Sequence, residues 1–478
     1  MNYELIGGEM TDWSDREPAG GPLLTHLISR LEPLGRRVLV AGPHAPALID
    51  ALAAYADVTC LVRAQRDAAD LGDRRGVTVR CGSLAKLTDS DHYDVIVALD
   101  GVERLCSVEG PQYDWTESVQ ALRRALRPGG ALLLSVENEL GVHRLVDRTT
   151  VTFAHTEDAW LPLGEFGTKP GSPERLESRL AAEGLTVGWL GTAWPSPSAP
   201  AFAATPAMLR YGPAGALGAA ASAAMASAYA GKPVLSDPRR LAAAAIRGGL
   251  GPEFAPAWLV VASRGTTSTV ELPQVFIGGR ADPAMPAGQL LEELLIGACL
   301  RHDLPAIRRL LAGWVAGQPT ATFDNVLVDG ETYTVLDRDR AGEEPATVLA
   351  RFAHTLLAGG YAQPWPAAAD VPSLTTILSA AAGLSADALP AAAATPEVPD
   401  SLREHEEQVR RLEEQLADAA VRIAYAENEL IKRDTELRRA RLQIDTFSGH
   451  VGYRLTKLSA RAARKAVRAV RRSPLFKD

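Results

Sequence analysis

Small or polar residues stand at the ends of four short apolar runs in the first hundred positions. Gly42 ends RVLVAG, Arg63 follows DVTCLV, Ser83 comes two residues after VTVRC, and Asp100 ends YDVIVALD. If these runs are parallel strands, their carboxyl ends meet at one edge of a sheet, where open α/β sheets bind their ligands. We therefore take the four residues as candidates for contact with a bound ligand.

Three further residues could accept a proton. Glu137 ends the apolar run ALLLSV, and His143 and His155 come after it. Carboxylate and imidazole groups serve as general bases, and histidine titrates near neutral pH. A single histidine is more often a structural residue than a base, so both roles stay open for each. Glu137, His143 and His155 are our candidate catalytic residues.

The elements that position these residues follow from the spacing of apolar side chains. The runs at 37–42, 57–62, 77–81, 93–100 and 131–138 are rich in aliphatic residues, and helical patterns separate them. This alternation is typical of a parallel sheet built from βαβ units. Further helices are predicted over 21–35 and 173–185, and further strands over 186–191 and 257–263. The sequence thus predicts an α/β domain over 20–265, with an Ala-rich insertion at about 200–250.

The later half of this domain resembles the class I methyltransferases that use S-adenosylmethionine (SAM). YDVIVALDGVERLCS is similar to their fourth strand, and ALRRALRPGGALLLSVENELG to the following helix and fifth strand. The resemblance implies a Rossmann-like sheet with SAM bound at its carboxyl edge. It implies cofactor contacts from Gly42, Arg63, Ser83 and Asp100, with Glu137, His143 and His155 on the acceptor side.

The first part of the domain departs from that family. His44 and Pro46 stand where further glycines are expected, and Val40 takes an acidic place before them. Arg63 stands where an acid usually holds the ribose of the cofactor, and Ser83 stands where an aspartate is common. These departures support a second hypothesis, in which the fold has lost its cofactor and serves as a scaffold for other enzymes.

A narrower resemblance suggests the substrate. Residues 101–103, 137–141 and the prolines at 195–200 are similar to methyltransferases of bacterial surface-polysaccharide gene clusters, which implies a glycan or glycolipid acceptor. In several such proteins a kinase-like module follows. FDNVLVDGETYTVLD resembles the metal-binding hairpin of that module, with Asn325 and Asp337 as its magnesium ligands.

The kinase resemblance weakens at other positions. Thr320 stands where a catalytic aspartate belongs, and Asp337 lacks the Phe-Gly that should follow it. We therefore predict an accessory unit over 266–385 of helices and a structural hairpin, with its turn at Asp329-Gly330. No metal site is predicted, because the four cysteines also lack paired spacing.

The last quarter of the chain differs in composition. A Pro- and Ala-rich linker is predicted over 386–400, and apolar residues recur every seven positions from Leu402 to Ile444. This repeat predicts a coiled coil over 401–447 and hence a homodimer. Residues 450–474 form a basic amphipathic pattern, which could lie on an anionic membrane leaflet or remain a solvated tail.

Charge is distributed unevenly along the chain. Residues 450–478 carry nine Lys or Arg and one Asp, whereas the other residues carry 41 basic and 57 acidic side chains. An acidic body argues against a nucleic-acid partner. The N-terminal residues do not follow the pattern of a secretory signal. We therefore expect a cytoplasmic protein that can contact the inner face of the membrane.

Overall fold

The computed structural model describes residues 2–12, 17–32, 35–88, 90–107, 110–111, 113–148, 168–265, 271–368, 370–384, 400–449 and 451–470. The chain divides into two compact units, residues 1–405 and 406–478. All the candidate site residues belong to the first unit.

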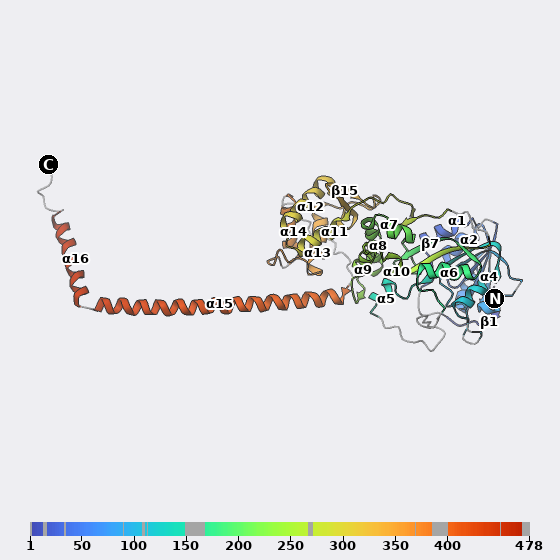
Figure 1. The fold of residues 1–478 in the computed structure, drawn as a ribbon, viewed down its shortest axis with the longest axis horizontal. Helices are drawn as coiled ribbons and strands as arrows, with labels where there is room; N and C mark the ends of the chain where they lie inside the picture. The colour runs from blue at the N-terminus through green and yellow to red at the C-terminus, as the bar shows by residue number, and fades with distance from the viewer. Residues whose placement is uncertain are drawn as a thin grey trace. The chain divides into compact units, whose positions relative to one another are not determined.

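An 11-stranded sheet runs through the part of the first unit that precedes residue 282, within the described residues (Figure 1). Its strand order is β1-β4-β3-β2-β5-β6-β10-β7-β8-β11-β12. Strands β1 to β6 are parallel, and β10 is antiparallel to both of its neighbours, β6 and β7. The strands are β1 (Glu4–Gly7), β2 (Arg37–Ala41), β3 (Asp57–Val62), β4 (Val77–Gly82), β5 (Tyr93–Ala98), β6 (Leu126–Glu137), β7 (Leu185–Trp194), β8 (Phe202–Ala204), β10 (Ala257–Arg264), β11 (Val275–Ile277) and β12 (Arg280–Ala281).

This order confirms the predicted α/β class with a large, mostly parallel sheet. From β2 the order runs through β3 and β4 to one side, and through β5 and β6 to the other. The reversal between β2 and β5 is the topological switch point, where sheets of this kind bind ligands beyond the strand ends. The candidate ligand residues Gly42 and Asp100 come from the chain just after these two strands.

Helices cover both faces of the sheet because successive strand residues point to opposite faces. Val38 and Val40 share a core with α1 (Pro22–Arg30), α2 (Pro46–Ala53) and α3 (Gln65–Gly72). Leu39 of the same strand packs on the other face, with α4 (Trp115–Ala125) and α6 (Pro173–Ala182). The parallel strands are thus buried on both sides, which explains their nearly continuous apolar sequences.

The sheet extends beyond the predicted boundaries at 20 and 265. At one end β1 pairs with β4, with Glu4 opposite Arg80. At the other end β11 pairs with β8, and β12 with β11. These strands are two to four residues long, so the apolar patterns that predict longer strands do not indicate them.

The predicted insertion is a helical layer joined to the sheet. It contains α7 (Pro206–Tyr211), α8 (Ala214–Tyr229), β9 (Pro233–Val234), α9 (Pro238–Arg247) and α10 (Gly251–Phe254). These elements share a core with Trp194 and Phe202 of the sheet and with α5 (Val142–Val146). The short strand β16 (Asp400–Ser401) pairs with β9, so the end of the predicted linker joins this layer.

The accessory unit has a hydrophobic core of its own, in which Trp314, Phe323 and Phe352 make edge-on ring contacts. The predicted hairpin is present, with Asp329 opposite Thr332 and Gly330 at a φ of 58°. The first two helices of the unit are separated just before Pro305. The elements are β13 (Gln289–Leu290), α11 (Leu291–Leu300), α12 (Leu304–Gly317), η2 (Phe323–Asn325), β14 (Val326–Asp329), β15 (Thr332–Val335), α13 (Pro345–Ala358) and α14 (Val371–Ala381).

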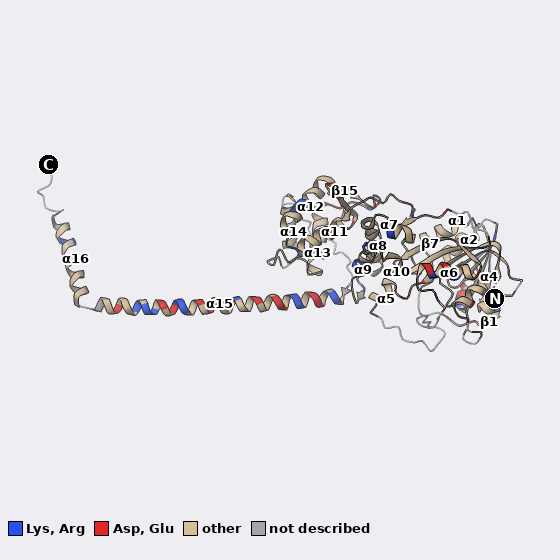
Figure 2. Ribbon diagram, in the orientation of Figure 1, with Lys and Arg blue, Asp and Glu red and all other residues tan. Residues whose placement is uncertain are grey.

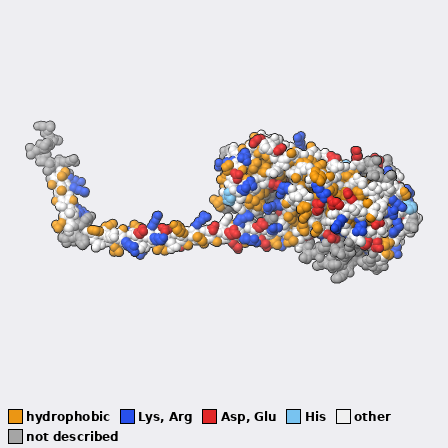
Figure 3. All heavy atoms as spheres, in the orientation of Figure 1, with side chains coloured by type: hydrophobic (Ala, Val, Ile, Leu, Met, Phe, Trp, Pro, Cys, Tyr) orange, Lys and Arg blue, Asp and Glu red, His pale blue; other side chains and the backbone are white. Residues whose placement is uncertain are grey.

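The C-terminal segments predicted as helices are helical. They are α15 (Leu402–Gly449) and α16 (Val451–Val470), and acidic and basic residues alternate in short blocks along α15 (Figure 2). The apolar residues of the heptad are exposed on the single chain, for example Leu416 at 71% and Leu430 at 66%. Apolar and basic side chains both reach the surface along these helices (Figure 3). Pairing with a second chain stays a prediction.

No helix in the described parts of the chain is both long enough and apolar enough to cross a bilayer.

Asn138 joins the end of β6 to the segment that leads into β10. Its side chain is buried, and its Nδ2 donates hydrogen bonds to the backbone carbonyls of Glu253 at 2.6 Å and Ala255 at 2.9 Å. Its Oδ1 accepts a hydrogen bond from the backbone N–H of Leu140 at 3.0 Å. One amide thus satisfies three buried or half-buried backbone groups.

We expect Asn138→Ala to lower the free energy of unfolding by about 2–4 kcal/mol, because it leaves those backbone groups without partners. Urea unfolding followed by circular dichroism measures the change. Glu139→Ala at the exposed neighbouring position is the control and should change stability by less than about 0.5 kcal/mol. Equal effects of the two substitutions would contradict the role given to the Asn138 amide.

Candidate functional site

The candidate site lies where the order of strands reverses. Gly42 follows β2 with a φ of 93°, a backbone conformation that favours glycine. A Cβ atom added to Gly42 would lie 3.6 Å from the Cβ of Asp100, which follows β5. The structure therefore brings these two predicted residues together at the switch point.

Two ion pairs are buried in the loop that follows β5. Asp100 and Arg104 pair with an Oδ2–Nε distance of 3.4 Å, and their side chains are 1% and 4% exposed. Glu103 pairs with Lys169 at 2.8 Å, and both of these side chains are also buried. Removing four charged groups from water is costly even when they are paired. Such a concentration of buried charge is typical of a functional site.

His44 occupies the space next to Gly42. Its Nε2 accepts a hydrogen bond from the backbone N–H of Leu99 at 3.1 Å, so the ring proton lies on Nδ1, which donates to the carbonyl of Gly42 at 2.9 Å. Burial lowers the pKa of His44 to about 4, so the ring is neutral at pH 7. The neutral ring links the end of β2 to the end of β5 across the switch point.

Arg63 and Ser83 both contact the N-terminal segment. The Nε of Arg63, which is buried, donates to the carbonyl of Gly8 at 3.0 Å. The backbone N–H of Met10 donates to the carbonyl of Arg63 at 2.8 Å, and that of Ser83 to the carbonyl of Gly7 at 2.9 Å. Residues 7–10 thus run along the ends of β3 and β4. This contact lies outside the predicted domain, which begins at residue 20.

Asp67 is a further residue of this site and was not among the predicted ones. It lies in the first turn of α3, four residues beyond Arg63, and its Oδ2 is buried without a hydrogen-bond partner among the described residues. Burial, together with the charges of Asp12, Asp70 and Asp100, raises the pKa of Asp67 to about 6. The sequence did indicate it in one respect. Asp67 is an acid that follows Arg63 by four residues, and Arg63 stands where class I methyltransferases usually carry an acid.

Glu137 and His143 lie together, as candidate catalytic partners should. The Nε2 of His143 is 3.0 Å from Oε1 of Glu137, and the same oxygen accepts a hydrogen bond from Nε of Arg144 at 3.0 Å. The other ring nitrogen of His143 is buried next to Gly141, whose added Cβ would lie 2.6 Å from it. As it stands, the arrangement holds the start of α5 to the end of β6. His155 lies outside the described residues.

The hairpin residues suggested by the kinase resemblance bind to protein groups. The Nδ2 of Asn325 donates to the carbonyl of Asp337 at 2.9 Å, and its Oδ1 accepts from the Asp337 N–H at 2.8 Å. The carboxylate of Asp337 pairs with Arg280 at 2.6 Å. The amide therefore closes the hairpin, and an arginine stands next to the carboxylate where the kinase resemblance implies a magnesium ion. Among the described residues no three His, Cys, Asp or Glu side chains gather as a metal site.

Comparison with known proteins gives weak similarities only. No family model matches the sequence, and no curated protein matches it. Solved structures of similar shape include a 1,6-didemethyltoxoflavin N1-methyltransferase of Burkholderia thailandensis with bound S-adenosylhomocysteine (12% identity, 51% of this chain and 77% of that chain, TM-score 0.29). A SAM-dependent methyltransferase of Geobacter sulfurreducens in complex with S-adenosylhomocysteine (17%, 52% and 92%, 0.27) and the [4+2]-cyclase SpnF (16%, 54% and 87%, 0.27) are others. The fold assignment above rests on the strand order.

The buried His44 predicts a loss of stability in acid. In the unfolded chain its pKa is near 6.5, whereas in the folded chain it is about 4. As pH falls from 6.5 towards 4, the unfolded state takes up a proton that the folded state does not, so folding stability falls. The contribution is about 3 kcal/mol over this range.

We expect the His44→Gln variant to lack this part of the pH dependence. Urea unfolding at a series of pH values between 7 and 4 should show a shallower loss of stability than in the unmodified protein. His92→Gln, at an exposed position, is the control and should keep the full slope. If the slope is the same with and without His44, its ring is not held in the neutral, buried state described here.

Proposed function

We propose that the first unit is a SAM-dependent methyltransferase with its cofactor at the switch point. The observation that carries this proposal is the buried pair of Asp100 and Arg104 next to Gly42. The amino-acid end of SAM carries an ammonium and a carboxylate group. A carboxylate and a guanidinium that lie together in a buried place suit such a zwitterion, since each charge of the ligand meets the opposite charge.

Other residues suit the rest of the cofactor. The positive φ of Gly42 and its missing side chain allow a ligand to approach the backbone. Asp67 presents a carboxylate near the end of β3, and we propose that it holds the ribose hydroxyls in place of the acid that Arg63 replaces. SAM supplies the methyl group, and the residues named here bind and orient it. His44 fills part of the usual glycine turn and would have to shift for the cofactor to enter.

We also propose that the methyl acceptor is a glycan or glycolipid precursor of cell-surface polysaccharide. The narrower resemblance at residues 101–103 and 137–141 supports this class of substrate. Glu137 and His143 follow β6 and remain our candidates for the acceptor side. The nitrogen of His143 that could accept a proton is buried, so a role as base requires α5 to move.

A second function is favoured by a specific observation. His44 bridges β2 and β5, and Arg63 is bonded to Gly8, so protein groups fill two places that a cofactor would use. A methyltransferase fold closed in this way would act as a scaffold for polysaccharide enzymes. The two functions differ in whether SAM binds.

The C-terminal helices suggest how the protein would dimerise and attach to a membrane under either function. We propose that α15 pairs with the same helix of a second chain, because its heptad residues are apolar and exposed. We propose that α16, which carries six Lys or Arg and no acid over 451–470, contacts an anionic leaflet.

Titration of SAM into the full-length protein, followed by calorimetry, tests the cofactor site. We expect micromolar binding of SAM and S-adenosylhomocysteine, weakened about tenfold by Asp67→Asn through the loss of charged hydrogen bonds to the ribose. This variant should fold, because it removes a carboxylate whose burial is unfavourable. Asp57→Asn, at the exposed opposite end of β3, is the control and should leave binding unchanged.

The same titration separates the two functions. If His44 only obstructs the site, His44→Gly should increase SAM affinity by about tenfold. Absence of binding in the unmodified protein and in His44→Gly, with both shown folded by circular dichroism, would favour the scaffold.

Sedimentation of the full chain tests the proposed dimer. We expect a dimer at micromolar concentration, and a monomer for Leu416→Asp combined with Ile423→Asp, because two charges would enter the apolar contact between helices. Val421→Asp is the control, since Val421 is equally exposed but lies outside the heptad. A monomeric unmodified protein, or equal effects of both sets, would exclude this mode of pairing.

A further inference from the structure

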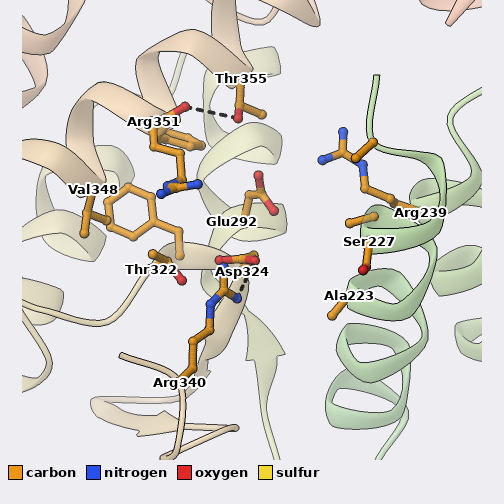
Figure 4. A pocket seen from close by; sticks show the side chains of 14 residues that line it. Ala223, Ser227, Arg239, Glu292, Thr322, Asp324, Arg340, Val348, Arg351 and Thr355 are labelled. Carbon is orange, nitrogen blue, oxygen red and sulfur yellow. Dashed lines mark hydrogen bonds and ion pairs between the residues drawn. The ribbon is translucent and has the colours of Figure 1, made fainter. Parts of the chain in front are cut away.

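A cavity of about 350 Å³ lies between the helical insertion and the accessory unit, away from the switch point. One wall comes from α8 and from Arg239 at the start of α9. The opposite wall comes from α11, η2 and α13 together with Arg340, which follows β15 (Figure 4). Cavities between two structural layers are common binding places for small molecules.

The three arginines that line the cavity already have acidic partners. Arg239 pairs with Asp237 at 2.6 Å, Arg340 with Asp324 at 2.8 Å, and Arg351 with Glu343 at 2.6 Å. Each guanidinium is thus neutralised while other N–H groups remain available as donors. The cavity consequently has no excess positive charge with which to attract a phosphate or a carboxylate.

Glu292 adds an acceptor to the cavity wall. Figure 4 shows it between Arg351 on one side and Arg239 on the other. Burial, and then the charge of Asp324, raises the pKa of Glu292 to about 7. Near neutral pH its carboxyl group can therefore either accept or donate a hydrogen bond.

Hydroxyl groups complete the polar lining. Thr322 is only 3% exposed, and its Oγ1 has no hydrogen-bond partner among the described residues. A buried hydroxyl without a partner costs about 1–3 kcal/mol, which a ligand in the cavity could offset. Ser227 of α8 and Thr355 of α13 supply two more hydroxyls.

The remaining lining is apolar and leaves space. One wall carries small residues, Ala223 and Ala226 of α8 and Ala230 just after it, and the opposite wall carries Phe323, Val348 and Phe352. Small side chains on one wall and phenyl rings on the other suit a ligand that has C–H surfaces between its polar groups. The cavity thus combines balanced charge, donors and acceptors, and apolar patches.

We propose that this cavity binds a neutral, hydroxyl-rich ligand, namely a saccharide segment of the glycan acceptor. This inference rests on the proposed function, because it identifies where part of that acceptor is held. The α9 helix, which carries Arg239, packs against α5, which carries His143. The cavity is therefore connected through two packed helices to the candidate acceptor side of the sheet.

Saturation-transfer NMR with the full-length protein tests the proposal. The probes are glucose, galactose, mannose, rhamnose and N-acetylglucosamine, with maltose and cellobiose as disaccharides, each at millimolar concentration. We expect saturable binding of at least one sugar. We expect Glu292→Leu and Thr322→Val each to weaken it about tenfold, because each removes a hydrogen bond to the ligand.

Matched variants show whether the binding belongs to this cavity. Ala223→Trp places a large side chain from an exposed α8 position into the cavity and should abolish binding without disturbing the core. Glu293→Leu, at the neighbouring residue that pairs with Arg247, should have no effect. Binding that Ala223→Trp leaves unchanged would overturn the proposal, as would saturable binding of pyrophosphate or spermidine in place of every sugar.

Measurement of SAM binding and sugar binding on the same variants separates the cavity proposal from the methyltransferase proposal. The cavity variants should bind SAM as the unmodified protein does, because their residues lie away from the switch point. Binding of SAM without any sugar binding would overturn the cavity proposal alone. Binding of a sugar without SAM would keep the cavity as a saccharide site and favour the scaffold for the sheet.

Discussion

The burial of charge beside the switch point is the constraint on which this edge of the first unit depends. Asp100 with Arg104, and Glu103 with Lys169, are removed from water almost completely. Loss of one partner from such a pair leaves an uncompensated buried charge and typically destabilises a protein by about 3–5 kcal/mol. The two pairs therefore fix the loop after β5, and Lys169 joins the chain before α6 to that loop. The free-energy cost of burying these four charges is most simply explained if the charges also bind a ligand.

The same edge carries groups that favour a closed state. The His44 ring satisfies one donor and one acceptor of the backbone, and Arg63 holds the N-terminal segment through Gly8. A cofactor that enters must replace these bonds, so part of its binding energy is used to open the site. The buried carboxylate of Asp67 instead favours cofactor binding, because hydroxyl groups of a ligand would donate hydrogen bonds to it. The balance between these groups decides whether the fold binds SAM or remains closed as a scaffold.

Much of the sheet could be predicted because each central strand is buried on both faces, which makes its sequence almost entirely apolar. The hairpin could be predicted from Asp329-Gly330, since Gly330 adopts the positive φ that the turn requires. The strand β1 could not, because it has four residues, half of them exposed, and pairs with β4 more than seventy residues later. Asp67 could not be predicted from the family resemblance. The resemblance concerns the residue at the strand end, whereas the Asp67 carboxylate comes from the first turn of a helix.

The cavity between the insertion and the accessory unit could not be predicted for a related reason. Its lining comes from three separated stretches, 223–239, residue 292 and 322–355, and no one of them has a recognisable binding motif. What the structure adds is the pairing of charges, which the sequence does not reveal. At the switch point the charged pair faces a glycine and suits a ligand that carries both charges. In the cavity each arginine is neutralised by its own acid, and polar groups of both kinds remain. Both places therefore hold acid–arginine pairs. They differ in that the cavity adds hydroxyl groups and apolar patches, which would favour a neutral saccharide there and leave the zwitterion to the sheet edge.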